Sequence, residues 1–128
     1  NGKVAVIRRI RSGNDVPFIY EESFLPGSMF REILEMDLTG SMYQIIHERF
    51  NVTLARSDQK IRAVNLKGRI ASYLDVPENS AAFFMESLTY DENNVPVELL
   101  HSYYRGDKYV FEIELGRYHI EEDRIHHE

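Results

Sequence analysis

Two strand-like segments joined by a short turn open the chain. Residues 3–11 (KVAVIRRIR) and 16–25 (VPFIYEESFL) alternate in character and are rich in β-branched and aromatic side chains, which is typical of strands. Residues 12–15 (SGND), which lie between them, are all turn formers. A turn this short returns the chain antiparallel to itself. The N-terminal part of the sequence therefore predicts an antiparallel β-hairpin.

The rest of the chain alternates strand-like segments with short helical ones. Apolar residues at helical spacing between Met42 and Phe50 predict a helix that begins near Thr39 or Ser41, because Ser and Thr are good N-caps. Further strands are expected at residues 53–66, 81–90, 95–104 and 109–115, and short helices at 29–35 and 67–74. About six strands, mostly joined by hairpins, predict an α+β domain with an antiparallel sheet. One face of that sheet can pack on the helices, and the other face or an edge cleft can hold a ligand.

Length and charge limit the class of protein. The chain has 128 residues, enough for one domain, and a formal net charge of −6. An acidic domain is repelled by nucleic acid, so direct binding to a duplex is not expected. The sequence holds no Cys, which excludes disulfides, thiolate nucleophiles and Cys-ligated zinc and suits the cytoplasm. No apolar run approaches the roughly 18 residues of a membrane span. Because the chain starts at Asn1 and opens almost directly into a strand, we expect an N-terminal part of a longer protein to be missing.

Arg9 and Arg11 lie two residues apart on a predicted strand, so both side chains share one face. Two neighbouring guanidiniums repel each other unless an anion joins them, and their planar forks suit phosphate or carboxylate. The alternative is an exposed face whose arginines pair with nearby acids. Glu21, on the partner strand, either pairs with an arginine or accepts hydrogen bonds from ligand hydroxyls.

Two other groups of polar residues are candidates for a binding site. Ser41 and Tyr43 stand at the predicted start of a helix, where free N–H groups attract anions, although every helix also needs a cap. Glu98 and Tyr104 share one face of a strand between apolar neighbours, as pocket residues often do. The opposite phase, in which Val97, Leu99 and Tyr103 face inward, remains open.

Catalytic and metal motifs are absent from the sequence. His47, His101 and His119 are scattered without HExxH spacing, and His126 and His127 stand in a polar tail. No GxSxG, P-loop or GxGxxG is present, and the adjacent acid pairs do not form a carboxylate dyad. We therefore predict no catalytic residue, no metal site and no cofactor.

The ordered set of motifs resembles a known family. RxR at Arg9 and Arg11 is followed by YEESFLP at residues 20–26, by SMY at 41–43, and by ASYLDVPENSAAFFMESLTYDENNVPVELLHSYYRGDKYVF at 71–111. This set resembles the UTRA domain, the effector-binding half of HutC-type regulators in the GntR family. The resemblance covers residues 4–115, and the run VPVELLHSYYRGDKYVF is its most specific part.

The resemblance implies a chorismate-lyase-like fold, a homodimer, and an N-terminal winged helix-turn-helix domain that binds operator DNA. Effectors in the family include sugar phosphates and histidine-pathway acids such as urocanate. By the same resemblance, Arg9, Arg11 and Ser41 hold the anionic group of the ligand. Glu21 and Tyr43 line the same pocket, and Glu98 and Tyr104 reach its hydroxyl-bearing end.

The prediction is therefore a cytoplasmic, non-enzymatic effector-binding domain at residues 1–118, with a polar tail at 119–128. Its ligand is a small anionic metabolite, with a sugar phosphate favoured, that modulates DNA binding by the missing N-terminal domain. It is expected to contact DNA only through that domain and to have no membrane partner. Two alternatives stay open: a small chorismate-lyase-like enzyme acting on an anionic metabolite, and a dimerisation module without a ligand.

Overall fold

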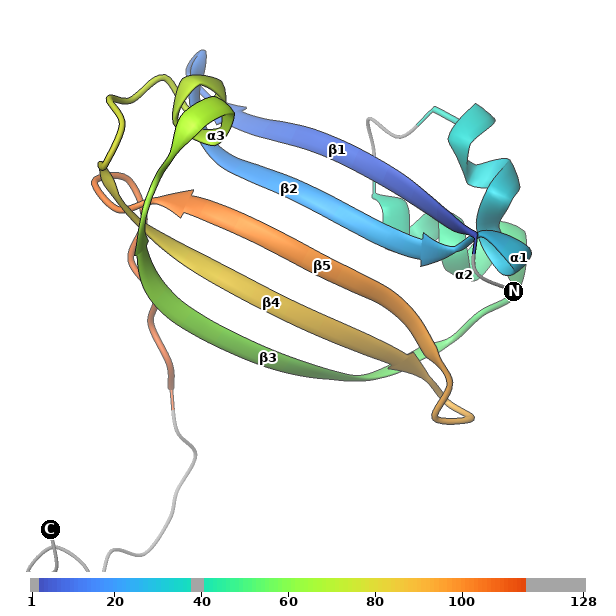
Figure 1. The fold of residues 1–128 in the computed structure, drawn as a ribbon. Coiled ribbons are helices and arrows are strands. Elements are labelled where there is room, and N and C mark those ends of the chain that lie inside the picture. Colours follow the sequence, from blue (N-terminus) through green and yellow to red (C-terminus); the bar gives the residue numbers. More distant parts are fainter. Residues whose placement is uncertain (1–2, 38–40, 115–128) are drawn as a thin grey trace, which may run out of the picture.

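The computed structural model describes residues 3–37 and 41–114, which form a five-stranded sheet with short helices (Figure 1). The strand order is β1-β2-β5-β4-β3, and every neighbouring pair is antiparallel. The strands are β1 (Val4–Gly13), β2 (Val16–Pro26), β3 (Leu54–Asn65), β4 (Ala81–Asp91) and β5 (Pro96–Arg105). The helices are α1 (Gly27–Phe30), the 3-10 helix η1 (Arg31–Glu35), α2 (Met42–Phe50) and α3 (Gly68–Tyr73). The predicted α+β class with an antiparallel sheet is confirmed.

The turn between β1 and β2 explains why the first hairpin forms. Gly13 pairs with Val16, which leaves Asn14 and Asp15 as a two-residue loop. Both loop residues have positive φ, 52° and 64°. Asn and Asp tolerate this conformation better than most residues, and such a turn matches the twist of the flanking strands. The hairpin predicted from the turn residues is confirmed.

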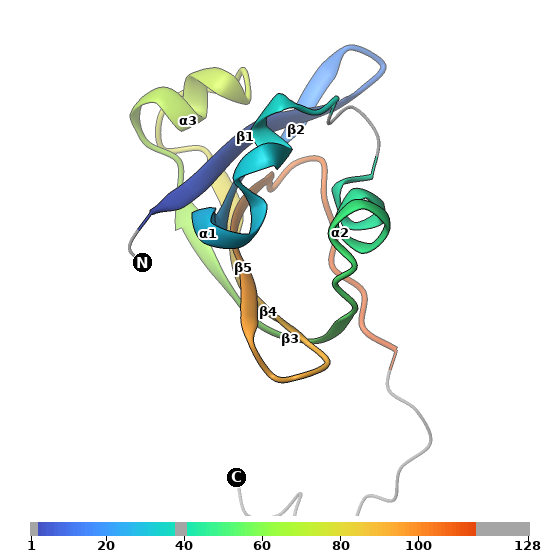
Figure 2. The same ribbon diagram turned by 90° about the vertical axis from the view of Figure 1, so that its right-hand side faces the viewer.

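Helices cover both faces of the sheet (Figure 2). On one face, Ala5, Ile7 and Leu25 pack in a single cluster with buried residues of α1, η1 and α2, including Phe30 and Ile46. We call this the α2 face. On the opposite face, which we call the α3 face, a second cluster joins the sheet to α3; its buried members are Tyr20, Leu66, Ala71, Leu74 and Ala82.

Helix α2 begins and ends at residues with clear capping roles. Ser41 is the N-cap, and its Oγ accepts a hydrogen bond from the Gln44 backbone N–H at 3.2 Å. Asn51 ends the helix in the left-handed conformation, as C-terminal residues often do. Met42 and Ile46 are buried against the sheet, so the N-terminal turn of α2 is held over the α2 face. Thr39, the other expected starting point, lies outside the described residues.

The sheet has five strands, and the prediction of a sixth strand at residues 109–115 is wrong for its described part, 109–114. The rings of Tyr109 and Phe111 pack on Tyr104, with centroid distances of 4.5 and 5.2 Å, and this segment lies on the same side of the sheet as α2 (Figure 2). Two aromatic residues separated by one position look like strand alternation whether or not a ladder forms. Leu115 and the predicted tail at 119–128, with the boundary at 118, lie outside the described residues.

A smaller difference concerns the helix expected at 29–35, which is divided into α1 and η1. The change from α to 3-10 geometry occurs at Phe30, whose side chain is fully buried. Its ring meets Phe50 of α2 edge-on, with a centroid distance of 5.0 Å. Such short helical pieces are stable because of tertiary packing rather than intrinsic propensity.

Candidate functional site

The two predicted arginines and Glu21 form one charged cluster on the α2 face. Arg9 lies directly across from Glu21 in the β1–β2 register. Glu21 Oε1 lies 3.5 Å from Arg9 Nη2 and 3.2 Å from Arg11 Nε. One largely buried carboxylate therefore bridges two guanidiniums, and the hairpin fixes all three because cross-strand neighbours share a face.

Glu98 on β5 is a second buried acid, only 2% exposed. Its Oε2 accepts a hydrogen bond from Ser23 Oγ at 2.6 Å, and its Oε1 accepts one from the Tyr43 hydroxyl at 2.7 Å. Burial, with the charge and hydrogen bond of Glu98, raises the pKa of Tyr43 above its usual value. Tyr43 therefore stays protonated at neutral pH and donates from α2 to the sheet.

These residues surround a cavity of about 720 Å³, within the usual size range of small-molecule sites. Six of the seven predicted site residues line it: Arg9, Arg11, Glu21, Ser41, Tyr43 and Glu98. Strands β1, β2 and β5 and the N-terminal turn of α2 contribute them, so the cavity lies between the sheet and α2. We call it the α2 cavity.

Tyr104, the seventh predicted residue, does not line the α2 cavity in the structure. It is 7% exposed and is covered by Tyr109 and Phe111. Burial is also the main reason why the pKa of Tyr104 is raised. Tyr104 lies on the α2 face, since it pairs with Ile19, but at the end of the sheet where the segment after β5 crosses that face.

The open question of strand phase in β5 has a mixed answer. Glu98 and Tyr104 are on the α2 face, as the first reading expected. Val97 is nevertheless fully buried in the same cluster as Leu25. The β4–β5 register passes from the pair Thr89–Glu98 to the pair Tyr90–Pro96, so Val97 is the extra residue of a β-bulge. A bulge breaks strict alternation, which lets consecutive residues share a face.

Sequence reasoning missed the part of the cavity formed by β3 and β4. The polar residues there are Arg56, Ser57, Gln59, Ser87 and Thr89, and the apolar ones include Leu54 and Met85. Alternation along each strand was the available signal, because Ser57 and Gln59, like Ser87 and Thr89, stand two residues apart. Alternation does not reveal which strand lies next to these residues, or which face of the sheet they share with the predicted site.

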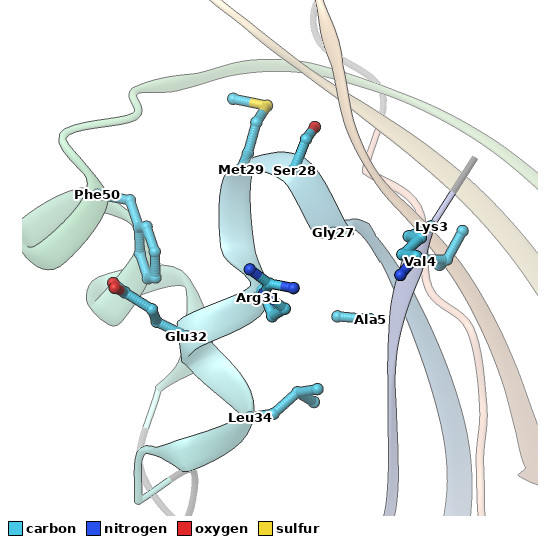
Figure 3. A pocket seen from close by; sticks show the side chains of 10 residues that line it. All are labelled: Lys3, Val4, Ala5, Gly27, Ser28, Met29, Arg31, Glu32, Leu34 and Phe50. Atoms are coloured by element: carbon cyan, nitrogen blue, oxygen red, sulfur yellow. The ribbon is translucent and has the colours of Figure 1, made fainter. Parts of the chain in front are cut away.

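A second hollow, of about 520 Å³, lies where β1 begins beside α1 and η1 (Figure 3). Its lining includes the exposed apolar residues Val4 and Leu34, with Lys3, Arg31 and Glu32. None of the predicted site residues lines this hollow. The buried carboxylates and paired arginines converge on the α2 cavity instead, which is why that cavity is the candidate site.

Residues 3–37 and 41–114 contain no group of three or more His, Cys, Asp or Glu side chains placed to hold a metal ion. No helix in this part of the chain is long and apolar enough to cross a membrane. His119, His126 and His127 lie outside the described residues.

Proteins that resemble this chain include transcription regulators. The family model of the UTRA domain matches residues 1–110. The HTH-type transcriptional repressor NagR of Bacillus subtilis (strain 168) is 28% identical over 105 residues, which make up 82% of this chain and 43% of NagR. The chain thus spans less than half the length of this curated relative.

Solved structures share the fold. A GntR-family transcriptional regulator from Enterococcus faecalis V583 superposes with a TM-score of 0.80 and 27% identity, covering 88% of this chain and 81% of that one. The effector domain of PhnF from Mycobacterium smegmatis has a TM-score of 0.84 over 89% of this chain and 70% of its own. At 24% identity, the likeness to PhnF shows the fold alone.

Proposed function

Because the chain belongs to the UTRA domain family, we propose that its α2 cavity binds a small anionic metabolite and so controls a GntR-family transcription regulator. The observation that carries the proposal is the bridge from Glu21 to Arg9 and Arg11 at the cavity wall. Two guanidiniums held on one face, with a single carboxylate between them, leave one positive charge in excess. That arrangement favours an anion with several oxygen atoms, and a sugar phosphate is the ligand that we favour.

The buried acid Glu98 supports a ligand with hydroxyl groups beyond its anion. A carboxylate accepts hydrogen bonds, and it already holds the hydroxyls of Ser23 and Tyr43. A hydroxyl-bearing ligand that enters the cavity supplies further donors of the same kind. Tyr104 joins this end of the site only if the segment that carries Tyr109 and Phe111 moves.

Regulation requires that the ligand bind one conformation better than another, because equal affinity for both shifts nothing. We propose that ligand binding draws α2 and the first hairpin together and reorients DNA-binding domains in a cytoplasmic homodimer. In this proposal, these domains are the N-terminal winged helix-turn-helix units of the full-length regulator. The sequence upstream of Asn1 tests this part: a basic helix-turn-helix segment supports the regulator, and a start codon immediately before Asn1 supports the lyase alternative.

Isothermal titration with sugar phosphates and small organic acids tests the anion site directly. We expect Arg9→Ala to weaken binding of the best ligand by at least about tenfold, or roughly 1.4 kcal/mol. Arg8→Ala is the matched control, because Arg8 is the sequence neighbour, is exposed, and pairs with Glu22 on the opposite face. Equal losses in the two variants, or no heat from any anion, would contradict the proposed site.

A further inference from the structure

A row of polar side chains forms the wall of the α2 cavity on the two strands farthest from β1. Ser57 and Gln59 on β3 and Ser87 and Thr89 on β4 all line the cavity. They are cross-strand neighbours, since Ser57 pairs with Thr89 and Gln59 pairs with Ser87. We call these four residues the polar wall.

The polar wall is connected by hydrogen bonds. Ser57 Oγ and Ser87 Oγ are 2.7 Å apart. Thr89 Oγ1 donates to Ser57 Oγ at 3.3 Å, and Gln59 Nε2 approaches Ser87 Oγ at 3.5 Å. Hydroxyl hydrogens rotate, and an amide offers both N–H and C=O groups, so the wall can donate to a ligand and accept from it.

Two residues of the polar wall are buried, which indicates that their polar side chains have a role beyond packing. Ser87 and Thr89 are only 3% and 6% exposed, although the neighbouring position on the same face of β4 is the apolar Met85. Burying a hydroxyl is costly where hydrogen bonds are lacking, and the network offsets that cost without replacing apolar packing. Core stability alone would favour apolar residues here, so the polar side chains point to a role in the cavity.

Arg56, the charged residue beside the polar wall, is engaged elsewhere. Its guanidinium carbon lies 4.0 Å from the centre of the Tyr90 ring, and its Nη2 lies 3.7 Å from Asp58 Oδ2. These contacts supply a partner for its charge. Arg56 also lines the cavity, but the four residues of the polar wall beside it are uncharged.

The two ends of the cavity are well separated. Strand β4 is three strands away from β1 in the order β1-β2-β5-β4, which at about 4.8 Å per step corresponds to about 14 Å measured along the sheet. An isolated phosphate or acetate cannot contact both the arginines and the polar wall. A ligand that contacts both must extend from its anion into a neutral body.

We infer that the polar wall is a second subsite, which selects ligands whose neutral end carries several hydroxyl groups. The inference rests on the proposed anion site and adds to it the residues that distinguish a polyhydroxylated anion from a bare one. The charged group of the ligand, phosphate or carboxylate, is held by Arg9 and Arg11. The hydroxyls at the far end of the ligand exchange hydrogen bonds with the four residues of the polar wall.

Calorimetric titration of the 128-residue chain with four probes tests the subsite. The probes are glucose 6-phosphate with inorganic phosphate, and gluconate with acetate, so that each hydroxylated anion is compared with its bare counterpart. We expect at least one hydroxylated anion to bind about tenfold or more tightly than its counterpart. The pair that shows the preference identifies the charged group as phosphate or carboxylate.

Variants of the wall complete the test. Ser87→Ala/Thr89→Val should abolish most of that preference while the affinity for the bare anion changes by less than about twofold. Gln59→Leu, at an exposed position, is a second variant if the double substitution does not fold, and Ser72→Ala on α3 is the control. If the hydroxylated anions show no preference, or keep it in the wall variants, the inference is overturned and the anion sensor stands. If no probe binds, the proposed function fails and the inference fails with it.

Discussion

At the scale of single residues, the Glu21 carboxylate lies where an anion bound by Arg9 and Arg11 would be expected. Its Oε1 atom lies within 3.5 Å of both Arg9 and Arg11, where an oxygen of a bound phosphate would be expected. The carboxylate thus limits repulsion between the guanidiniums. The same carboxylate repels an anion that approaches them, so in the proposed site it should weaken the binding of that anion.

Glu21→Gln should therefore strengthen the binding of a bare anion. The variant removes one negative charge beside two arginines and keeps a side chain of the same shape. We expect the affinity for inorganic phosphate to rise by about tenfold at low salt, and this gain to shrink as salt increases. Titration calorimetry at two salt concentrations measures both effects.

Glu22→Gln is the control for this prediction, because Glu22 lies on the α3 face and pairs with Arg8. It should leave phosphate affinity nearly unchanged. A weaker affinity in Glu21→Gln would show that Glu21 orients the arginines more than it competes with the anion.

At the scale of elements, α2 supplies two of the predicted site residues from its N-terminal end. Ser41 caps the helix, and Tyr43 donates to Glu98 on the sheet. Capping alone accounts for a serine at this position. Ser41→Ala would remove both the cap and any contact with the ligand, so it cannot separate a loss of stability from a loss of binding. A different substitution separates the two roles.

Ser41→Asp should keep the cap and lose the ligand. Aspartate is as good an N-cap as serine and interacts well with the helix dipole, so the free energy of unfolding should stay within about 0.5 kcal/mol of the wild type. Its negative charge at the cavity wall should weaken phosphate binding by about tenfold or more. Chemical denaturation and calorimetry measure the two quantities. Unchanged binding in Ser41→Asp would restrict Ser41 to capping.

Features set by residues close together in the sequence could be predicted, whereas those that depend on contacts between distant segments could not. The cluster of Arg9, Arg11 and Glu21 could be predicted because one hairpin, with a two-residue loop, sets its register. The polar wall was not, because it depends on how β3 pairs with β4 across a long intervening segment. Tyr104 was placed on the correct face, yet its cover by Tyr109 and Phe111 depends on a chain path that alternation does not encode.

At the scale of the whole molecule, tyrosines stabilise both faces of the sheet in their protonated form. Burial, with the hydrogen bond and charge of Glu22, raises the pKa of Tyr20 on the α3 face to about 12. Burial also raises the pKa of Tyr103, which packs near Tyr20. On the α2 face the pKa values of Tyr43 and Tyr104 are raised as well. The fold as a whole is therefore coupled to phenol ionisation.

This coupling predicts a loss of stability in alkali. The phenols of the unfolded chain ionise near pH 10, whereas these four phenols keep their protons to higher pH in the folded chain. Above pH 10 the folded state therefore binds more protons than the unfolded state, and the free energy of unfolding falls as pH rises towards about 12. Below pH 10 these groups are protonated in both states, so their contribution to stability is fully present and does not vary with pH. Denaturant titrations at a series of pH values measure how the free energy of unfolding changes with pH.

Tyr43→Phe should be less stable than the wild type at pH 8, because Glu98 loses a hydrogen-bond donor, but its free energy of unfolding should decline less steeply above pH 10. An equally steep decline in this variant would mean that Tyr43 does not contribute to the coupling between folding and phenol ionisation.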